Sequence, residues 1–157
     1  MIYRQANHDT DGKNQPTILR KPEIIHGLRN LIQNGVDFAE SQVWVETGWS
    51  DQTISVRIMD DGPGFPVHML GRIGDPFVRQ RKTGQAADSR PEYEGMGLGL
   101  FIAKTLLERS GAHLRFANAP EGQENGAVVE VIWPRNSIAT EPQELSVPLG
   151  KNQHIKI

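Results

Sequence analysis

The chain has 157 residues, and its 17 basic and 19 acidic side chains leave a formal net charge of −2. This length suits one globular domain with tails, and no apolar run reaches the roughly 18 residues that span a membrane. The lack of cysteine excludes disulfides and thiolate metal sites, and the near-neutral charge gives no reason to expect a nucleic-acid partner.

The first 17 residues are polar and predict a flexible lead-in. Residues 1–5 and residues 17–20 each have the composition of a short edge strand. Pro22 and Glu23 predict the start of a helix that runs to residue 40, because proline and an acid both suit a first helical turn. Helical spacing puts one set of residues on its core face: Ile24, Leu28, Leu31, Ile32, Gly35 and Ala39.

Three residues of this helix, Asn30, Asn34 and Phe38, follow one another at intervals of about one turn along the edge of the core face. Asparagine is a poor residue for a helix interior, so a pair of amides one turn apart is a candidate binding feature. Asparagines that simply face solvent or a neighbouring loop are the alternative, and the pair alone does not decide between the two.

Period-two alternation predicts strands over 42–49 and 53–59, joined as a hairpin by Ser-Asp-Gln. The second strand runs into Asp60-Asp61-Gly62-Pro63-Gly64-Phe65-Pro66, where the glycines and prolines turn the backbone sharply out of the sheet. A carboxylate at such a strand end can face a cleft, and a plain hairpin-type turn is the alternative.

The segment 66–95 is a long loop whose basic stretch over 79–90 has no periodicity. Its position predicts a lid, with a solvated surface loop as the alternative. It leads into three glycines at alternate positions and then into an apolar helical pattern that ends at Gly111. In this second core helix the helical spacing is kept by Leu98, Ile102, Leu106 and Leu107, with Phe101 and Thr105 beside them. Unhindered N–H groups at the start of a helix form a ready site for phosphate.

A second hairpin is predicted over 112–118 and 127–133, followed by a polar, proline-spaced tail. The order helix, hairpin, loop, helix, hairpin predicts an α+β two-layer sandwich, with a mixed, mostly antiparallel sheet covered on one face by helices. We expect the flexible lead-in over 1–17, the globular domain over 18–135 and the tail over 136–157.

Four motifs stand out along the chain: Asn30-Leu31-Ile32-Gln33-Asn34, Asp60-Asp61-Gly62-Pro63-Gly64, Asp75-Pro76-Phe77 and Gly95-Met96-Gly97-Leu98-Gly99-Leu100. Their order and rough spacing resemble the sequence boxes of the ATP-binding domain of sensor histidine kinases. That domain has the Bergerat-type fold shared with gyrase, the heat-shock-90 chaperones and the MutL ATPases. The set is far more specific than any one motif. A looser likeness, at residues 36–39 and 73–76, is to redox-responsive kinases of the RegB/PrrB type.

The resemblance implies that the ligands are ATP and Mg²⁺. Asn34, with Asn30 helping, would hold Mg²⁺ by its side-chain oxygen, and Asp60 would accept a hydrogen bond from the exocyclic amine of adenine. Gly62 and Gly64 would let the backbone approach the base.

The remaining implied contacts lie at the base and at the phosphates. Phe38 and Phe77 would lie at the nucleotide, and Arg79, with Arg81 and Lys82 less directly, would reach the phosphates from the lid. The phosphate cradle would be shaped by Gly95, Gly97 and Gly99, with Leu98 and Leu100 as core anchors. The implied catalytic set is Asn30, Asn34 and Arg79.

One departure from the family pattern bears on the reaction. Asn30 stands where the hydrolysing relatives carry a glutamate that activates water, and a neutral amide is a poor general base, so hydrolysis by the domain alone should be slow. A superfamily ATPase module, or a non-enzymatic sensing module that binds nucleotide, is the alternative to a kinase.

The partners follow from the same resemblance. His26 lies inside the first predicted helix and is a poor candidate for a phosphoacceptor, so the accepting histidine is expected on a separate dimerisation domain of the same kinase. That implies a transferase in a two-component system, which passes phosphate on to a response regulator. We expect a monomeric isolated domain, a homodimeric full-length protein, and a cytoplasmic position in a bacterial kinase anchored in the inner membrane.

Overall fold

The computed structural model describes residues 2–5, 15–73, 96–120 and 126–140. Its elements, in chain order, are β1 (Ile2–Gln5), α1 (Pro22–Phe38), β2 (Val43–Trp49), β3 (Thr53–Asp60), the 3-10 helix η1 (Val67–Arg72), α2 (Met96–Arg109), β4 (His113–Asn118), β5 (Ala127–Pro134) and α3 (Arg135–Ile138). None of the helices in these ranges combines the length and the apolar character needed to cross a membrane.

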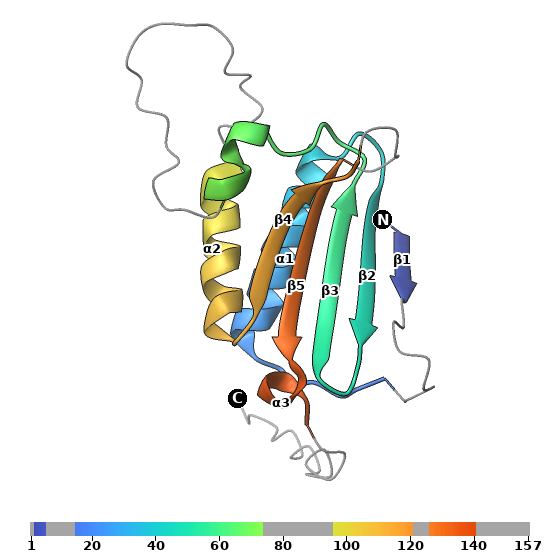
Figure 1. Cartoon of the computed structure of the whole chain (residues 1–157), viewed down its shortest axis with the longest axis vertical. Coiled ribbons are helices and arrows are strands. Elements are labelled where there is room, and N and C mark those ends of the chain that lie inside the picture. The colour runs from blue at the N-terminus through green and yellow to red at the C-terminus, as the bar shows by residue number, and fades with distance from the viewer. Residues whose placement is uncertain (1, 6–14, 74–95, 121–125, 141–157) are drawn as a thin grey trace, which may run out of the picture.

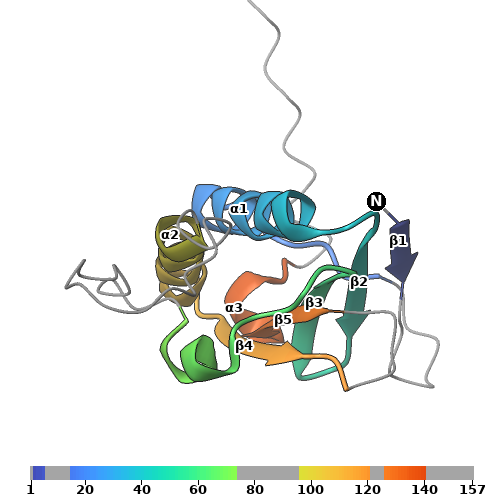
Figure 2. The same ribbon diagram turned by 90° about the horizontal axis from the view of Figure 1, so that it is seen from above.

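The strands form one sheet in the order β1-β2-β3-β5-β4 (Figure 1). Among the described strands, β1 pairs with β2 in parallel, whereas the other three strand pairs are antiparallel. Helices α1 and α2 lie together over one face of the sheet, as Figure 2 shows from above. The predicted α+β two-layer sandwich, with its mixed and mostly antiparallel sheet, is therefore confirmed.

The core lies between the sheet and the two long helices, and strand alternation supplies half of it. Along β5 every second side chain is buried, from Ala127 to Trp133, because successive residues of a strand face opposite sides. The largest fully buried side chains are Trp133, Leu31, Leu107, Ile138 and Val131. The two helices approach closely at Gly27, where an added Cβ would lie 2.5 Å from Cγ of Leu107.

The buried side of α2 differs from the predicted one. Leu100 and Leu107 are buried at 3% and 0% exposure, whereas Leu98 and Ile102 are 62% and 39% exposed. Leu98 and Ile102 each lie two residues from Leu100, which turns them about 200° around the helix axis. The prediction that Leu98 anchors the core is therefore wrong, and that of Leu100 is confirmed.

The two ends of the described domain meet at α3. Ile138 is 0% exposed, and its carbonyl accepts a hydrogen bond from the N–H of Leu19 at 2.8 Å. In place of the strand predicted over 17–20, Ile18 forms an isolated antiparallel bridge with Ala139. The polar tail predicted from residue 136 thus begins with residues that pack into the fold, and residues 141–157 lie outside the described part.

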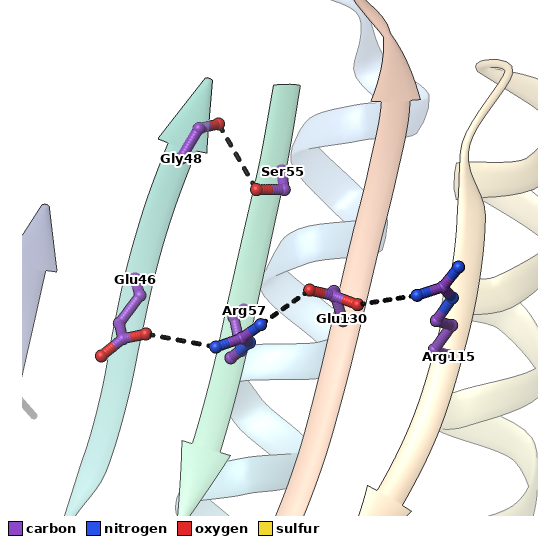
Figure 3. Close-up of polar contacts among 6 residues, drawn as sticks. All are labelled: Glu46, Gly48, Ser55, Arg57, Arg115 and Glu130. Carbon is purple, nitrogen blue, oxygen red and sulfur yellow. Dashed lines mark hydrogen bonds and ion pairs between the residues drawn. The ribbon is translucent and has the colours of Figure 1, made fainter. Parts of the chain in front are cut away.

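The sheet face opposite the helices carries a row of four charges in register across four strands (Figure 3). Arg57 Nη2 lies 2.9 Å from Glu130 Oε1, and Arg57 Nη1 lies 3.8 Å from Glu46 Oε2. Arg115 Nη1 extends the row, 3.7 Å from Glu130 Oε2. We call these four residues the charge ladder, and because its signs alternate, each carboxylate faces at least one guanidinium.

Candidate functional site

A cavity opens between α1, the first turns of α2 and the ends of β3 and β5. Its volume is about 380 Å³, including space open to solvent. It is lined by Leu31, Asn34, Gly35, Phe38, Ile58, Asp60, Gly64, Phe65, Leu100, Ala127 and Val129. The fold therefore brings together five of the residues that the sequence motifs single out, namely Asn34, Phe38, Asp60, Gly64 and Leu100.

Asp60, at the end of β3, is the charged residue among those that line this cavity, and it is only 5% exposed. Its Oδ1 accepts hydrogen bonds from the N–H groups of Gly62 at 2.9 Å and Ala127 at 3.3 Å. Both hydrogen bonds that the described residues donate to this carboxylate go to Oδ1. Burial raises the pKa of Asp60, and the two N–H groups oppose that rise only in part.

Tight backbone contacts fix the loop that follows Asp60. A Cβ on Gly62 would lie 2.1 Å from the carbonyl oxygen of Phe38, at the end of α1. A Cβ on Gly126 would likewise lie 1.9 Å from the carbonyl oxygen of Gly62. Glycine is therefore required at position 62 by the close contact between chain segments. Gly64, in contrast, has a φ of 76° and lines the cavity.

The second asparagine of the predicted pair lies beside the glycine-rich junction. Asn34 Oδ1 is 3.8 Å from the position that a Cβ on Gly99 would take. Helix α2 begins at Met96, so Gly97 and Gly99 lie in its first turn, where N–H groups lack intrahelical acceptors. An amide oxygen and the positive end of a helix dipole therefore meet at one edge of the cavity.

Asn30 is half-buried one turn earlier on α1, and it is not among the cavity-lining residues. Among the described residues there is no group of three or more His, Cys, Asp or Glu side chains that could hold a metal. A neutral amide such as that of Asn34 fits an ion that brings most of its own ligands, as Mg²⁺ does when it is bound to phosphates and water. Phe77, Arg79 and Gly95 lie outside the described residues, so their roles stay predictions.

Asp61 has a structural task that the sequence did not reveal. Its Oδ1 accepts hydrogen bonds from the N–H groups of Ser41 and Gln42, each at 2.9 Å, and its Oδ2 also accepts the Ser41 hydroxyl. Burial acts to raise the pKa of Asp61, but these hydrogen bonds outweigh it and lower the pKa to about 2. The two adjacent aspartates therefore differ: Asp60 lines the cavity, and Asp61 holds the connection between α1 and β2.

Asn118, the last residue of β4, was also missed. Its Oδ1 accepts a hydrogen bond from the N–H of Phe65 at 2.7 Å, and its Nδ2 donates to the carbonyl of Phe65 at 2.7 Å. The two residues are 53 positions apart, so no local pattern could pair them. The only available signal was an asparagine at a strand end just before a proline-containing turn.

Comparisons with known proteins agree with this geometry. Residues 20–137 match the family of histidine kinase-, DNA gyrase B-, and HSP90-like ATPases. The sensor histidine kinase RegB of Cereibacter sphaeroides is 57% identical over 146 residues, which cover 88% of this chain and 31% of that protein. The chain thus spans about a third of the length of this curated relative.

Two solved structures have the same fold. The mycobacterial sensor histidine kinase MprB superposes with a TM-score of 0.58 at 21% identity, covering 85% of this chain and 82% of that one. Full-length ShkA in complex with AMPPNP also gives a TM-score of 0.58 at 22% identity, covering 89% of this chain and 26% of that one. With the family match over residues 20–137, they lead to one conclusion: the chain belongs to the histidine kinase-, DNA gyrase B- and HSP90-like ATPase family.

Proposed function

We propose that this domain binds Mg-ATP in the cavity and presents the γ-phosphate to a histidine on a separate dimerisation domain of a two-component sensor kinase. The observation that carries the proposal is the buried carboxylate of Asp60, 5% exposed, whose Oδ1 is occupied by the N–H groups of Gly62 and Ala127. An acceptor fixed in this way at an apolar cavity suits a base with an amine at its edge.

The base end of the proposed site selects adenine. Asp60 Oδ2 accepts a hydrogen bond from the exocyclic amine, and a hydrogen bond to a charged group contributes about 1.5–3 kcal/mol. Guanine would present a carbonyl to the same carboxylate, so two acceptors would face each other without a proton between them. Phe38 and Phe65 line the same cavity and supply apolar walls.

The phosphate end of the proposed site lies at Asn34 and the first turn of α2. Asn34, with Asn30 helping, would hold Mg²⁺, which neutralises phosphate charge when it is bound with ATP. The N–H groups around Gly97 and Gly99 would contact phosphate oxygens, and Arg79 would reach them from the lid. Because Asn30 is a neutral amide, it would leave water unactivated, so catalysis rests on positioning the γ-phosphate for another domain.

The proposed partners are a dimerisation domain that carries the accepting histidine and, through it, a response regulator. The 57% identity to a protein named as a sensor histidine kinase supports these partners. We propose further that the full-length protein is a homodimeric, redox-responsive bacterial kinase anchored in the inner membrane, with this domain in the cytoplasm.

The first test compares two adjacent aspartates. Asp60→Asn should weaken AMPPNP binding in the presence of Mg²⁺ by about 10- to 150-fold, because an amide nitrogen would face the amine of adenine. Asp61→Asn is the matched control, since its carboxylate contacts Ser41 and Gln42 rather than the cavity. Calorimetry at a temperature where both variants are folded measures the affinities. Equal affinity in wild type and Asp60→Asn would contradict the proposal.

A second test concerns the reaction. The chain is mixed with a cognate dimerisation domain and γ-labelled ATP, and acid-labile label on the histidine is followed over time. We expect labelled histidine and little free phosphate, since Asn30 is a poor base. Steady phosphate release by the chain alone would favour an ATPase module, and tight binding without labelled histidine would favour a sensing module.

A further inference from the structure

We propose that Asn118 is a positioning residue for the base end of the cavity, an inference that rests on the proposed binding of ATP. Asn118 is half-buried at the end of β4 and does not line the cavity itself. Its side chain acts through the loop that follows Asp60, because it holds the cavity-lining residue Phe65 at both backbone polar groups.

The contact between Asn118 and Phe65 is reciprocal. Oδ1 of Asn118 accepts from the Phe65 N–H, and Nδ2 donates to the Phe65 carbonyl, both at 2.7 Å. A primary amide is the one small neutral side chain that can donate and accept side by side in this way. The pair of bonds therefore fixes both the position and the rotation of the peptide groups on either side of Phe65.

Neighbouring contacts depend on the same arrangement. Gly64 has a φ of 76°, and a Cβ added there would lie 2.8 Å from Asn118 Oδ1. The ring of Phe65, 5% exposed, meets the ring of Phe116 edge-on, with centroids 6.0 Å apart and an interplanar angle of 83°. Phe116 and Asn118 lie two residues apart on β4 and share one face, so strand β4 holds the cavity wall through both residues.

The end of β4 is also coupled to Asp60. Asn118 pairs in register with Ala127, whose N–H donates to Asp60 Oδ1 at 3.3 Å. Gly126 is the residue just before β5. Its carbonyl accepts a hydrogen bond from the Ala119 N–H at 2.9 Å, and its N–H donates to the Asp60 carbonyl at 2.6 Å. The end of β4 is thus linked both to Asp60 and to Phe65, two residues that line the cavity. Loss of the Asn118 amide should loosen the base end of the cavity.

The experiment measures the affinity of the 157-residue chain for ATP and for inosine triphosphate, which carries an oxygen in place of the adenine amine. Asn118→Ala should raise the Kd for ATP about tenfold, the scale expected when two hydrogen bonds that shape a site are lost. It should also shrink the preference for ATP over inosine triphosphate, because the alignment of Asp60 with the base is lost. A merely structural role would lower the unfolding midpoint without changing that preference.

Ser110→Ala is the matched control. Ser110 Oγ accepts from Trp133 Nε1 at 2.8 Å and donates to the Leu107 carbonyl at 2.6 Å, so this variant also removes two hydrogen bonds. Ser110 follows the C-terminal end of α2, whereas the cavity lies at its N-terminal end. We expect a lowered unfolding midpoint, an unchanged Kd for ATP and an unchanged preference over inosine triphosphate.

Asn118→Asp keeps the shape and the acceptor but sets an oxygen against the Phe65 carbonyl, so it should bind ATP as weakly as Asn118→Ala. If either variant kept the wild-type affinity for ATP and the wild-type preference over inosine triphosphate, this inference would be overturned, but the proposed function would stand. Loss of the fold in both variants would also overturn the inference, because Asn118 would then be a structural residue. Failure of the wild-type chain to bind ATP would instead overturn the proposed function and, with it, this inference.

Discussion

Gly62 offers a sharp test of the site's construction. A Cβ at this position would lie 2.1 Å from the Phe38 carbonyl oxygen and 3.0 Å from Asp60 Oδ1. To reach an ordinary contact distance, the loop or the end of α1 would have to move by about 1 Å. The loop cannot retreat freely, because the Gly62 carbonyl also lies close to Gly126. Backbone yields less than a side chain, so the free-energy cost of this overpacking should lie at the upper end of the usual range. Gly62→Ala should therefore destabilise the fold by about 3 kcal/mol.

The assay is urea unfolding followed by fluorescence of the three tryptophans. Gly71→Ala is the control, because a Cβ there meets nothing within 4 Å and should change stability by about 0.4–1 kcal/mol at most, in the stabilising direction. Gly62→Ala should also weaken ATP binding, since the Gly62 N–H orients the Asp60 carboxylate. A loss of stability below about 1 kcal/mol in Gly62→Ala would refute the reasoning from close backbone contact.

Two further predictions concern charged groups away from the cavity. The pKa of Asp61, about 2, lies below the value near 3.9 of an unfolded chain, so its contribution to stability is present above pH ~4 and is lost as pH falls from about 4 towards 2. Asp61→Asn should therefore lower the urea midpoint at pH ~6, and the midpoint of this variant should fall less between pH ~6 and pH ~3 than that of the wild type. A fall as steep as in the wild type would contradict the lowered pKa of Asp61. In the charge ladder, Glu130→Gln weakens contacts to Arg57 and Arg115 and should cost about 0.5–1 kcal/mol, because partly exposed ion pairs are weak. Unfolding in about 1 M salt should reduce that difference, and a difference that does not change with salt would rule out an electrostatic origin.

Much of the fold could be predicted because the relevant signals are local. Period-two alternation marked β2, β3, β4 and β5 to within a residue or two, since a strand with one buried face must alternate. The start of α1 at Pro22 followed from the preference of proline for a first turn. The motif order also identified Asn34, Asp60 and Gly64 as candidates, and the fold brings all three to one cavity.

The face of α2 was beyond local reasoning. Leu98, Leu100, Phe101 and Ile102 put apolar side chains on both sides of the helix, so periodicity did not single out one arc. The helix takes the orientation in which Leu107 packs at Gly27 of α1, and that choice buries Leu100 and exposes Leu98. Packing against another element decided what the sequence of this helix left open.

The two long helices and the strands β2, β3, β4 and β5 could be predicted from the sequence alone, because periodicity and turn residues depend on neighbours along the chain. The close contact that keeps Gly62 small at Phe38, and the hold of Asn118 on Phe65 from 53 residues away, depend on how the elements pack together. The structure also revealed the task of Asp61, which accepts hydrogen bonds from Ser41 and Gln42, whereas Asp60 accepts them from Gly62 and Ala127. Such roles arise from contacts between distant segments, and no pattern of adjacent residues encodes them.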